Sequence, residues 1–263
     1  MKKHEYIGIW LLLAVALSIV VLVAFSDDIS LMGYSLKKAP IAEFLLKDEK
    51  AEADSILKAD SIRLAEKKKL EEVKTDSLPQ TIFIFGDSMT FNLALRLAQY
   101  ARQNGHKIYS VNWDSSNTKL WATTDTLKYF LDDFKPTQVF ISLGSNELYY
   151  KNPEVHAPYV KKIIETLDTI PYVWIGPPNW NGSSEFNEML ARICSPGSFF
   201  RSEGMTFKRK KDKIHPTREA SALWIDSIMR WVSKSSHPFI AETPSDSIGK
   251  VNPHITFLKA LNK

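Results

Sequence analysis

The stretch TIFIFGDSMT, residues 81–90, begins as a run of apolar residues and stops abruptly at Gly86 and Asp87. This pattern predicts a strand that turns into a helix. In open α/β sheets, sites form at the carboxyl edge of the strands. Ser88 therefore stands where a nucleophile is placed, provided that a base and an acid come from elsewhere. The segment DKIHP, residues 212–216, offers both far downstream.

Strands and helices are expected to alternate after this stretch. Near-continuous apolar strands separated by helices are typical of a parallel sheet that is covered on both faces. We therefore expect a three-layer α/β/α sandwich with a central parallel sheet. The expected strands cover residues 81–85, 107–112, 137–143 and 171–176, and the expected helices lie near 89–103, 119–133, 154–168, 184–194 and 217–233.

Each expected strand delivers polar residues at its carboxyl end. Parallel strands end at one edge of a sheet, so these segments should meet there and form a single site. The segments are GDS at 86–88, NWDSSNT at 112–118, GSNE at 144–147 and GPPNW at 176–180.

The composition limits the class of protein. Of the 263 residues, 44% are hydrophobic and 24% are charged, as in a globular protein. A net charge of +4 is too weak to indicate a nucleic-acid partner. The single cysteine, Cys194, excludes an intrachain disulfide and is expected to be structural.

Four histidines of the chain show no metal-binding pattern. His106, His156, His237 and His254 lie in polar or proline-rich loops without the paired spacing of metal ligands. We expect surface positions for these four histidines, and we expect neither a metal nor a cofactor.

The amino terminus differs from the rest of the chain. Residues 7–25 are almost wholly apolar and long enough to cross the roughly 30 Å hydrocarbon core of a bilayer. Lys2 and Lys3 precede them, which predicts a single transmembrane anchor with a cytoplasmic amino terminus. The alternative is a signal peptide cleaved near residues 24–26. Both interpretations place the rest of the chain outside the cytoplasm, in a periplasmic location.

The chain divides into four expected regions. Residues 1–28 are the anchor or an uncleaved signal, and residues 29–79 are a charged helical or flexible spacer. Residues 80–235 are the catalytic domain. Residues 236–263, with several prolines, are expected to form an irregular tail that packs on the domain or stays loose.

Three blocks of residues 80–235 resemble those of the SGNH (GDSL-type) hydrolases. A Gly-Asp-Ser alone is a weak signal, but three blocks in the right order, each at the end of its element, are strong. The resemblance implies the flavodoxin-like sheet of the SGNH hydrolases. The matching blocks are GDS at 86–88, GSNE at 144–147 and DKIHP at 212–216, which is followed by a helix.

The resemblance also implies a Ser-His-Asp triad. Ser88 would attack an ester carbonyl, His215 would act as its base, and Asp212 would fix the tautomer of the imidazole. The oxyanion would meet the backbone N–H of Ser88, the side-chain amide of Asn146 and one more backbone N–H. The alternative for Asp87 is a plain helix cap, with Ser88 as an early helical residue.

The second block of the family differs here. Its members usually carry glycine where this chain has Ser116, in SSNT at residues 115–118. The backbone N–H of Ser116 can still contribute to an oxyanion hole. A side chain at this position would narrow the pocket or require another backbone conformation.

Two further features border the expected site. Trp180, which follows two prolines, either lines the acyl or sugar pocket or is a structural aromatic. The basic run KRKKDK, residues 208–213, leads into His215. It is either a solvated loop or a surface that attracts an anionic polymer or the membrane.

The expected function is that of a membrane-anchored, extracytoplasmic serine esterase. It would remove O-acyl groups, typically O-acetyl, from carbohydrate of the cell envelope. The first alternative is an O-acyltransferase, in which a sugar hydroxyl resolves the same acyl-serine and a membrane protein donates the acyl group. An inert SGNH-like domain that binds glycans or scaffolds an assembly is an alternative of another class. Only Ser116 supports it.

Overall fold

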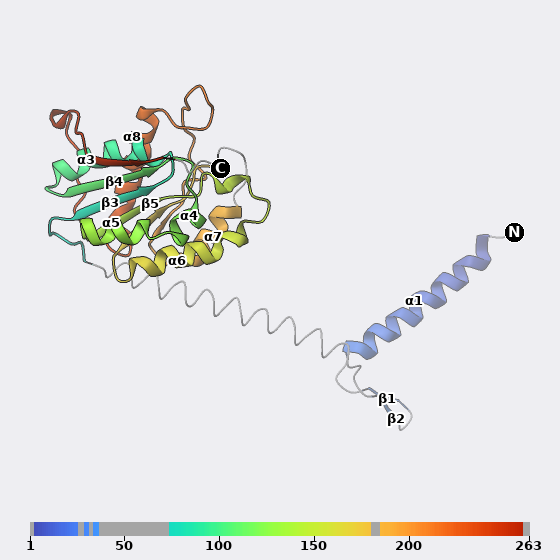
Figure 1. The fold of residues 1–263 in the computed structure, drawn as a ribbon. Helices are drawn as coiled ribbons and strands as arrows, with labels where there is room; N and C mark the ends of the chain where they lie inside the picture. Colours follow the sequence, from blue (N-terminus) through green and yellow to red (C-terminus); the bar gives the residue numbers. More distant parts are fainter. Residues whose placement is uncertain (1–2, 26–28, 32–33, 37–73, 180–184, 260–263) are drawn as a thin grey trace. The chain divides into compact units, whose positions relative to one another are not determined.

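The computed structural model contains two compact units, Met1–Lys67 and Lys68–Lys263 (Figure 1). It describes residues 3–25, 29–31, 34–36, 74–179 and 185–259. Most of the expected spacer, residues 29–79, lies outside the described residues.

In its described residues, the first unit contains one helix and a small sheet. The helix α1 spans Lys3–Phe25, and the strands β1 (Ile29–Leu31) and β2 (Tyr34–Leu36) pair antiparallel. α1 covers the apolar segment for which the sequence predicts a membrane anchor. In the described part of the chain, no helix combines the length and the hydropathy that crossing a membrane requires. Side chains near both ends of α1 lie outside that part.

The second unit is built on a six-stranded sheet in which all strands run parallel (Figure 1). This observation confirms the expected α/β fold with a central parallel sheet. In spatial order the strands are β7 (Phe199–Phe200), β6 (Tyr172–Ile175), β5 (Gln138–Ser142), β3 (Thr81–Gly86), β4 (Lys107–Trp113) and β8 (His254–Leu258).

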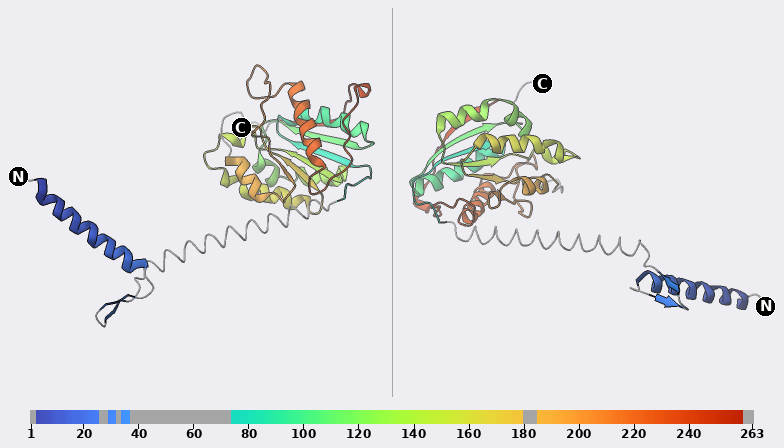
Figure 2. Two further views of the ribbon diagram at one scale, coloured as in Figure 1. Left: turned by 180° about the vertical axis from the view of Figure 1, so that it is seen from behind. Right: turned by 90° about the horizontal axis from the view of Figure 1, so that it is seen from below.

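Helices cover both faces of this sheet (Figure 2). Successive residues of a strand point to opposite faces. Phe83 and Phe85 of β3 therefore join one core, whereas Ile82 and Ile84 join the other. The first core is closed by α4 (Thr118–Thr123), α5 (Thr126–Phe134), α6 (Ala157–Leu167) and α7 (Glu185–Ile193), and the second by α3 (Thr90–Gln103) and α8 (Arg218–Val232).

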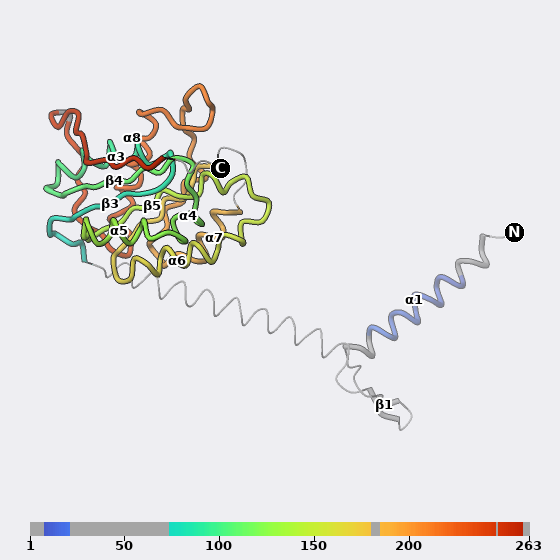
Figure 3. The backbone as a smooth tube through the Cα atoms, in the orientation of Figure 1, coloured from blue at the N-terminus to red at the C-terminus, as the bar shows by residue number. Residues whose placement is uncertain are grey.

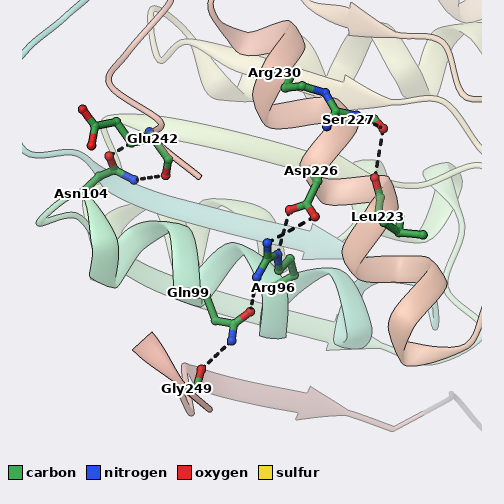
Figure 4. A network of polar contacts seen from close by, with 9 residues as sticks. All are labelled: Arg96, Gln99, Asn104, Leu223, Asp226, Ser227, Arg230, Glu242 and Gly249. Atoms are coloured by element: carbon green, nitrogen blue, oxygen red, sulfur yellow. Dashed lines mark hydrogen bonds and ion pairs between the residues drawn. The ribbon is translucent and has the colours of Figure 1, made fainter. Parts of the chain in front are cut away.

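An ion pair links the two helices of the second core (Figure 4). Nε of Arg96 on α3 lies 2.8 Å from Oδ1 of Asp226 on α8, and a second guanidinium nitrogen lies 3.2 Å from Oδ2. The two side chains are only 19% and 17% exposed. The ion pair therefore lies at the border of the apolar contact between α3 and α8.

The carboxyl-terminal segment differs from the sequence expectation. Part of the predicted irregular tail is the strand β8, which pairs with β4 at the edge of the sheet. Gln99 on α3 and Asn104 at the end of α3 bind the segment of chain that leads to β8 (Figure 4). Gln99 donates to the carbonyl of Gly249, and Asn104 exchanges hydrogen bonds of 2.9 Å with the backbone of Glu242. The backbone of β8 thus completes the sheet.

The strand order places a switch point between β3 and β5. From β3 the chain moves to β4 on one side and later returns to β5 on the other. In doubly wound sheets, the crevice at such a point is where ligands bind. Figure 3 traces the chain through these strands, and residues 87–88 and 144–147 begin at their carboxyl ends.

Candidate functional site

A close approach of two strands presents Ser88 at the edge of the sheet. A Cβ on Gly86 would stand 1.9 Å from the carbonyl oxygen of Ser142 on β5, so only glycine fits. The N–H of Asp87 donates to the same carbonyl at 3.0 Å. These contacts fix the turn after β3, and Ser88 follows it in a half-buried position.

The structure brings the three predicted triad residues together. Oγ of Ser88 lies 2.8 Å from Nε2 of His215, and Nδ1 of His215 lies 2.9 Å from Oδ2 of Asp212. Both distances are those of hydrogen bonds. Oδ1 of Asp212 accepts the backbone N–H groups of Ile214 and His215, each at 2.9 Å. A hydroxyl, an imidazole and a carboxylate thus form one continuous chain.

The electrostatics of this chain favour one arrangement of protons. Hydrogen bonds from the backbone of His215 and Ile214, followed by the bond to the His215 ring, lower the pKa of Asp212 to about 2. The ionised carboxylate accepts Nδ1–H, which leaves Nε2 to accept a hydrogen bond from the hydroxyl of Ser88. The His215 side chain is 29% exposed, so the pair is open to solvent.

A tight hairpin, residues 208–217, holds His215 ahead of α8; it lies in the orange loop of Figure 3. Its two arms are joined by backbone hydrogen bonds. Lys210 donates to the carbonyl of His215, and Thr217 donates to the carbonyl of Lys208, both at 2.8 Å. Thr217 also accepts an N–H as the N-cap of α8. Backbone bonds therefore position the histidine from both sides.

Among the residues predicted for the oxyanion hole, Asn146 contacts the segment that follows β4, but one of its two amide hydrogens already forms a hydrogen bond there. Nδ2 of Asn146 donates to the carbonyl of Ser116 at 2.7 Å, which leaves its second N–H for another acceptor. Ser116 is fully buried, and its own N–H donates to the carbonyl of Trp113 at 3.0 Å. Its hydroxyl accepts the indole N–H of Trp121 at 2.9 Å. An oxyanion contact from the Ser116 N–H would have to break the bond to Trp113.

Two buried carboxyl groups beneath the site are absent from the predicted set of site residues. Asp87 and Glu147 are both fully buried. Asp87 accepts the N–H groups of Met89 at 3.0 Å and Ser145 at 3.2 Å. Glu147, which opens the short helix η1 (Glu147–Tyr149), accepts the N–H of Thr118 at 2.6 Å. The two acids thereby tie together the segments that follow β3, β4 and β5. Asp87 directly precedes Ser88, and Glu147 directly follows Asn146. Their position beside predicted site residues is the sequence signal that could have identified them.

Burial governs the protonation of these acids. Desolvation raises the pKa of Asp87 to about 6 and that of Glu147 to about 7. Among the described residues, Oε2 of Glu147 has no hydrogen-bond partner. The buried layer therefore holds protons at a pH where the exposed Asp212 is ionised.

The predicted surface position of His156 is wrong. This residue ends the short helix η2 (Pro153–His156) and is only 4% exposed. Its Nδ1 lies 2.9 Å from Oγ1 of Thr118 and 4.0 Å from Oε1 of Glu147. Its ring packs against Tyr150 at a centroid distance of 4.7 Å, and burial lowers the pKa of His156. The helix α6 that follows is amphipathic, so no local pattern marks this histidine as buried.

The remaining predictions concern pocket and metal residues. Trp180 lies outside the described residues. Within the described ranges, no cluster of three or more His, Cys, Asp or Glu side chains could hold a metal ion. Cys194 is buried, and desolvation raises the pKa of its thiol to about 12, so the thiolate is not formed near neutral pH.

Comparison of the chain with protein-family models gives no match, and comparison with curated proteins gives none either. A function for this chain is therefore inferred from the geometry of Ser88, His215 and Asp212.

Proposed function

We propose that this chain is an SGNH-type serine esterase that acts on O-acyl esters of envelope carbohydrate. The observation that carries the proposal is the continuous contact from Ser88 through His215 to Asp212, with distances of 2.8 and 2.9 Å. A buried helix cap would need neither the imidazole nor the carboxylate. A serine aligned with a base and an orienting acid is the recurring arrangement of acyl transfer.

The reaction would proceed in two steps. Oγ of Ser88 attacks the ester carbonyl while its proton moves to Nε2 of His215. The tetrahedral oxyanion then collapses, the C–O bond to the alcohol breaks, and the alcohol leaves with the proton from His215. Water repeats the sequence on the acyl-serine and releases the carboxylic acid. Asp212 stabilises the imidazolium throughout.

The proposed mechanism uses two donors for the oxyanion. They are the backbone N–H of Ser88 and the second amide hydrogen of Asn146, whose first hydrogen is fixed by the carbonyl of Ser116. Loss of one such donor typically costs about 3–4 kcal/mol in the transition state. The proposal therefore does not require the N–H of Ser116.

The acyltransferase alternative uses the same acyl-serine. A sugar hydroxyl would replace water as the second nucleophile, and the acyl group would come from a membrane donor protein. The partial exposure of His215 leaves room for either acceptor. An inert glycan-binding or scaffolding domain would retain the fold without reacting at Ser88.

Reactivity of Ser88 tests the proposal. The full chain in nonionic detergent is incubated with para-nitrophenyl acetate and, separately, with a fluorophosphonate probe. Parallel samples carry Ser88→Ala, His215→Ala and, as a control, Ser77→Ala at an exposed serine. Nitrophenol release and labelling by the parent and the control, but by neither site variant, would support the esterase. Equal release by all four proteins would refute it, and added sugar acceptors would separate transfer from hydrolysis.

The predicted anchor and extracytoplasmic location belong to the same proposal and have their own test. Cell membranes are extracted with alkaline carbonate, and the pellet is probed for the full chain and for a chain that begins at Lys68. Retention of the full chain alone would support the tether. Release of both would remove it, without bearing on the chemistry of Ser88.

A further inference from the structure

The hairpin that carries His215 is strongly cationic. Five of the six residues at 208–213 are basic, and the single acid among them, Asp212, is already bound to His215 and to two backbone N–H groups. Within the described part of the chain, none of the lysines of this hairpin forms an ion pair. The exposed lysines are Lys208, Lys210, Lys211 and Lys213.

The register of the hairpin places part of this charge beside the histidine. Arg209 pairs with Pro216 across the two arms, and hydrogen bonds close the arms on both sides of that pair. Lys210 therefore stands directly opposite His215, and directly opposite residues project to the same side of a hairpin. Alternation along the arm gives Lys208 the same side.

The charge is also held in place by a stiff backbone. By the same alternation Arg209 projects to the other side of the arm, where its guanidinium donates to the carbonyl of Ile214. The N–H of Lys213 donates to the carbonyl of Lys210 at 3.0 Å, which tightens the tip of the hairpin. Little backbone ordering is therefore needed when a ligand binds, and only the lysine side chains lose freedom.

We propose that this hairpin binds an anionic polysaccharide, such as a chain of uronic acid units, and guides its esters to Ser88. The inference rests on the proposed function for the fate of the ester, whereas the binding itself does not depend on catalysis. Single exposed lysine–carboxylate contacts contribute little each, so useful affinity needs several at once. A polymer with a charge on each unit supplies them, and a small anion does not.

The observations favour this ligand over two other polyanions. Interfacial binding to a membrane combines basic residues with inserted apolar side chains. The hairpin exposes its lysines and Asp212 but no large apolar side chain, because Ile214 is half-buried and Phe207, which precedes the hairpin, is buried. Single-stranded nucleic acid is held by stacking on aromatic side chains, and residues 208–217 contain no Phe, Tyr or Trp.

The test measures binding of labelled polygalacturonate to the full chain in nonionic detergent by fluorescence polarisation. The variant Lys210→Gln/Lys211→Gln is compared with Lys161→Gln/Lys162→Gln, which removes the same charge from exposed positions of α6. We expect the hairpin variant to bind about fivefold to tenfold more weakly and with a smaller salt dependence. The α6 variant should bind within about twofold of the parent.

Three results would overturn the proposal. They are equal losses in both variants, binding of neutral dextran as tight as that of polygalacturonate, and tighter binding of detergent micelles that contain phosphatidylglycerol or of a thymidine oligonucleotide, with the same dependence on the hairpin lysines. Labelling of Ser88 by the fluorophosphonate is measured on the same samples. A protein that binds the polymer but is not labelled would refute the esterase and leave the anionic ligand standing.

Discussion

Replacing Glu147 by glutamine should stabilise the folded protein in alkaline solution and change it little in mild acid. Glu147 is fully buried, one of its oxygens accepts the N–H of Thr118 at 2.6 Å, and the other has no partner among the described residues. Glutamine keeps the accepting oxygen and never carries a charge. The comparison therefore isolates the free energy of burying one carboxylate.

The magnitude follows from the shifted titration. Burial raises the pKa of Glu147 from the ordinary 4.5 to about 7. Between these two values the folded state holds a proton that the unfolded chain has lost, so stability falls as the pH rises through this window. At about 1.4 kcal/mol per pH unit the loss is about 3 kcal/mol and is complete above pH 7. The glutamine variant does not lose this free energy of unfolding, so at pH 8 it should be more stable than the parent by up to about 3 kcal/mol.

Urea unfolding at pH 5 and pH 8 measures this difference. The fluorescence of the buried Trp121, Trp174 and Trp224 reports on the cores on both faces of the sheet. Glu165→Gln, at an exposed position of α6, is the matched control and should not change the pH dependence. The reasoning fails if the gap between Glu147→Gln and the parent is the same at both pH values. Asp87 titrates in all three proteins, but its charge also raises the pKa of Glu147, so the measured gap includes the repulsion between the two carboxylates.

Three further predictions concern other parts of the second unit. Asp212→Asn should lower kcat for para-nitrophenyl acetate about 10³-fold to 10⁴-fold, because an amide does not hold the reactive tautomer of the histidine; a loss below about tenfold in steady-state assays would exclude that role. Gly86→Ala should destabilise the fold by about 3 kcal/mol in thermal unfolding, because its Cβ would stand 1.9 Å from the Ser142 carbonyl oxygen. A double-mutant cycle of Arg96→Met and Asp226→Leu should give a coupling energy of about 1 kcal/mol in urea unfolding, and zero coupling would mean that the largely buried pair does not add to stability.

The central strands were predictable because their sequences carry the signal of full burial. The apolar run of β3 at 81–86 and the run of β5 at 138–142 are buried along almost their whole length. The edges of the sheet carry no such signal. β7 is two residues long, and β8 at 254–258 is only partly buried and preceded by prolines, so its pairing depends on tertiary contacts rather than on local pattern.

The site was predictable to the extent that it follows strand ends. Ser88 and His215 could be proposed because a short polar block ends an apolar strand or precedes a helix. The hydrogen bond from the N–H of Ser116 to the carbonyl of Trp113 closes a turn that the local sequence does not predict. The burial of His156 likewise depends on three elements meeting, which no local pattern encodes.

The carboxyl groups around the site separate into two kinds, and their environments explain the division. Asp212 accepts three hydrogen bonds at an exposed position, which lower its pKa to about 2. Asp87 and Glu147 are buried, and desolvation raises their pKa values to about 6 and about 7. Near pH 5 the negative charge beside His215 is therefore that of Asp212, while the two buried acids hold protons. Replacement of Asp212 should therefore lower the activity of the proposed triad at every pH at which the triad is active. Replacement of Glu147 by glutamine should change the stability only at a pH where Glu147 is ionised. Different environments thus give three acids of one sheet edge separate roles in charge and in structure.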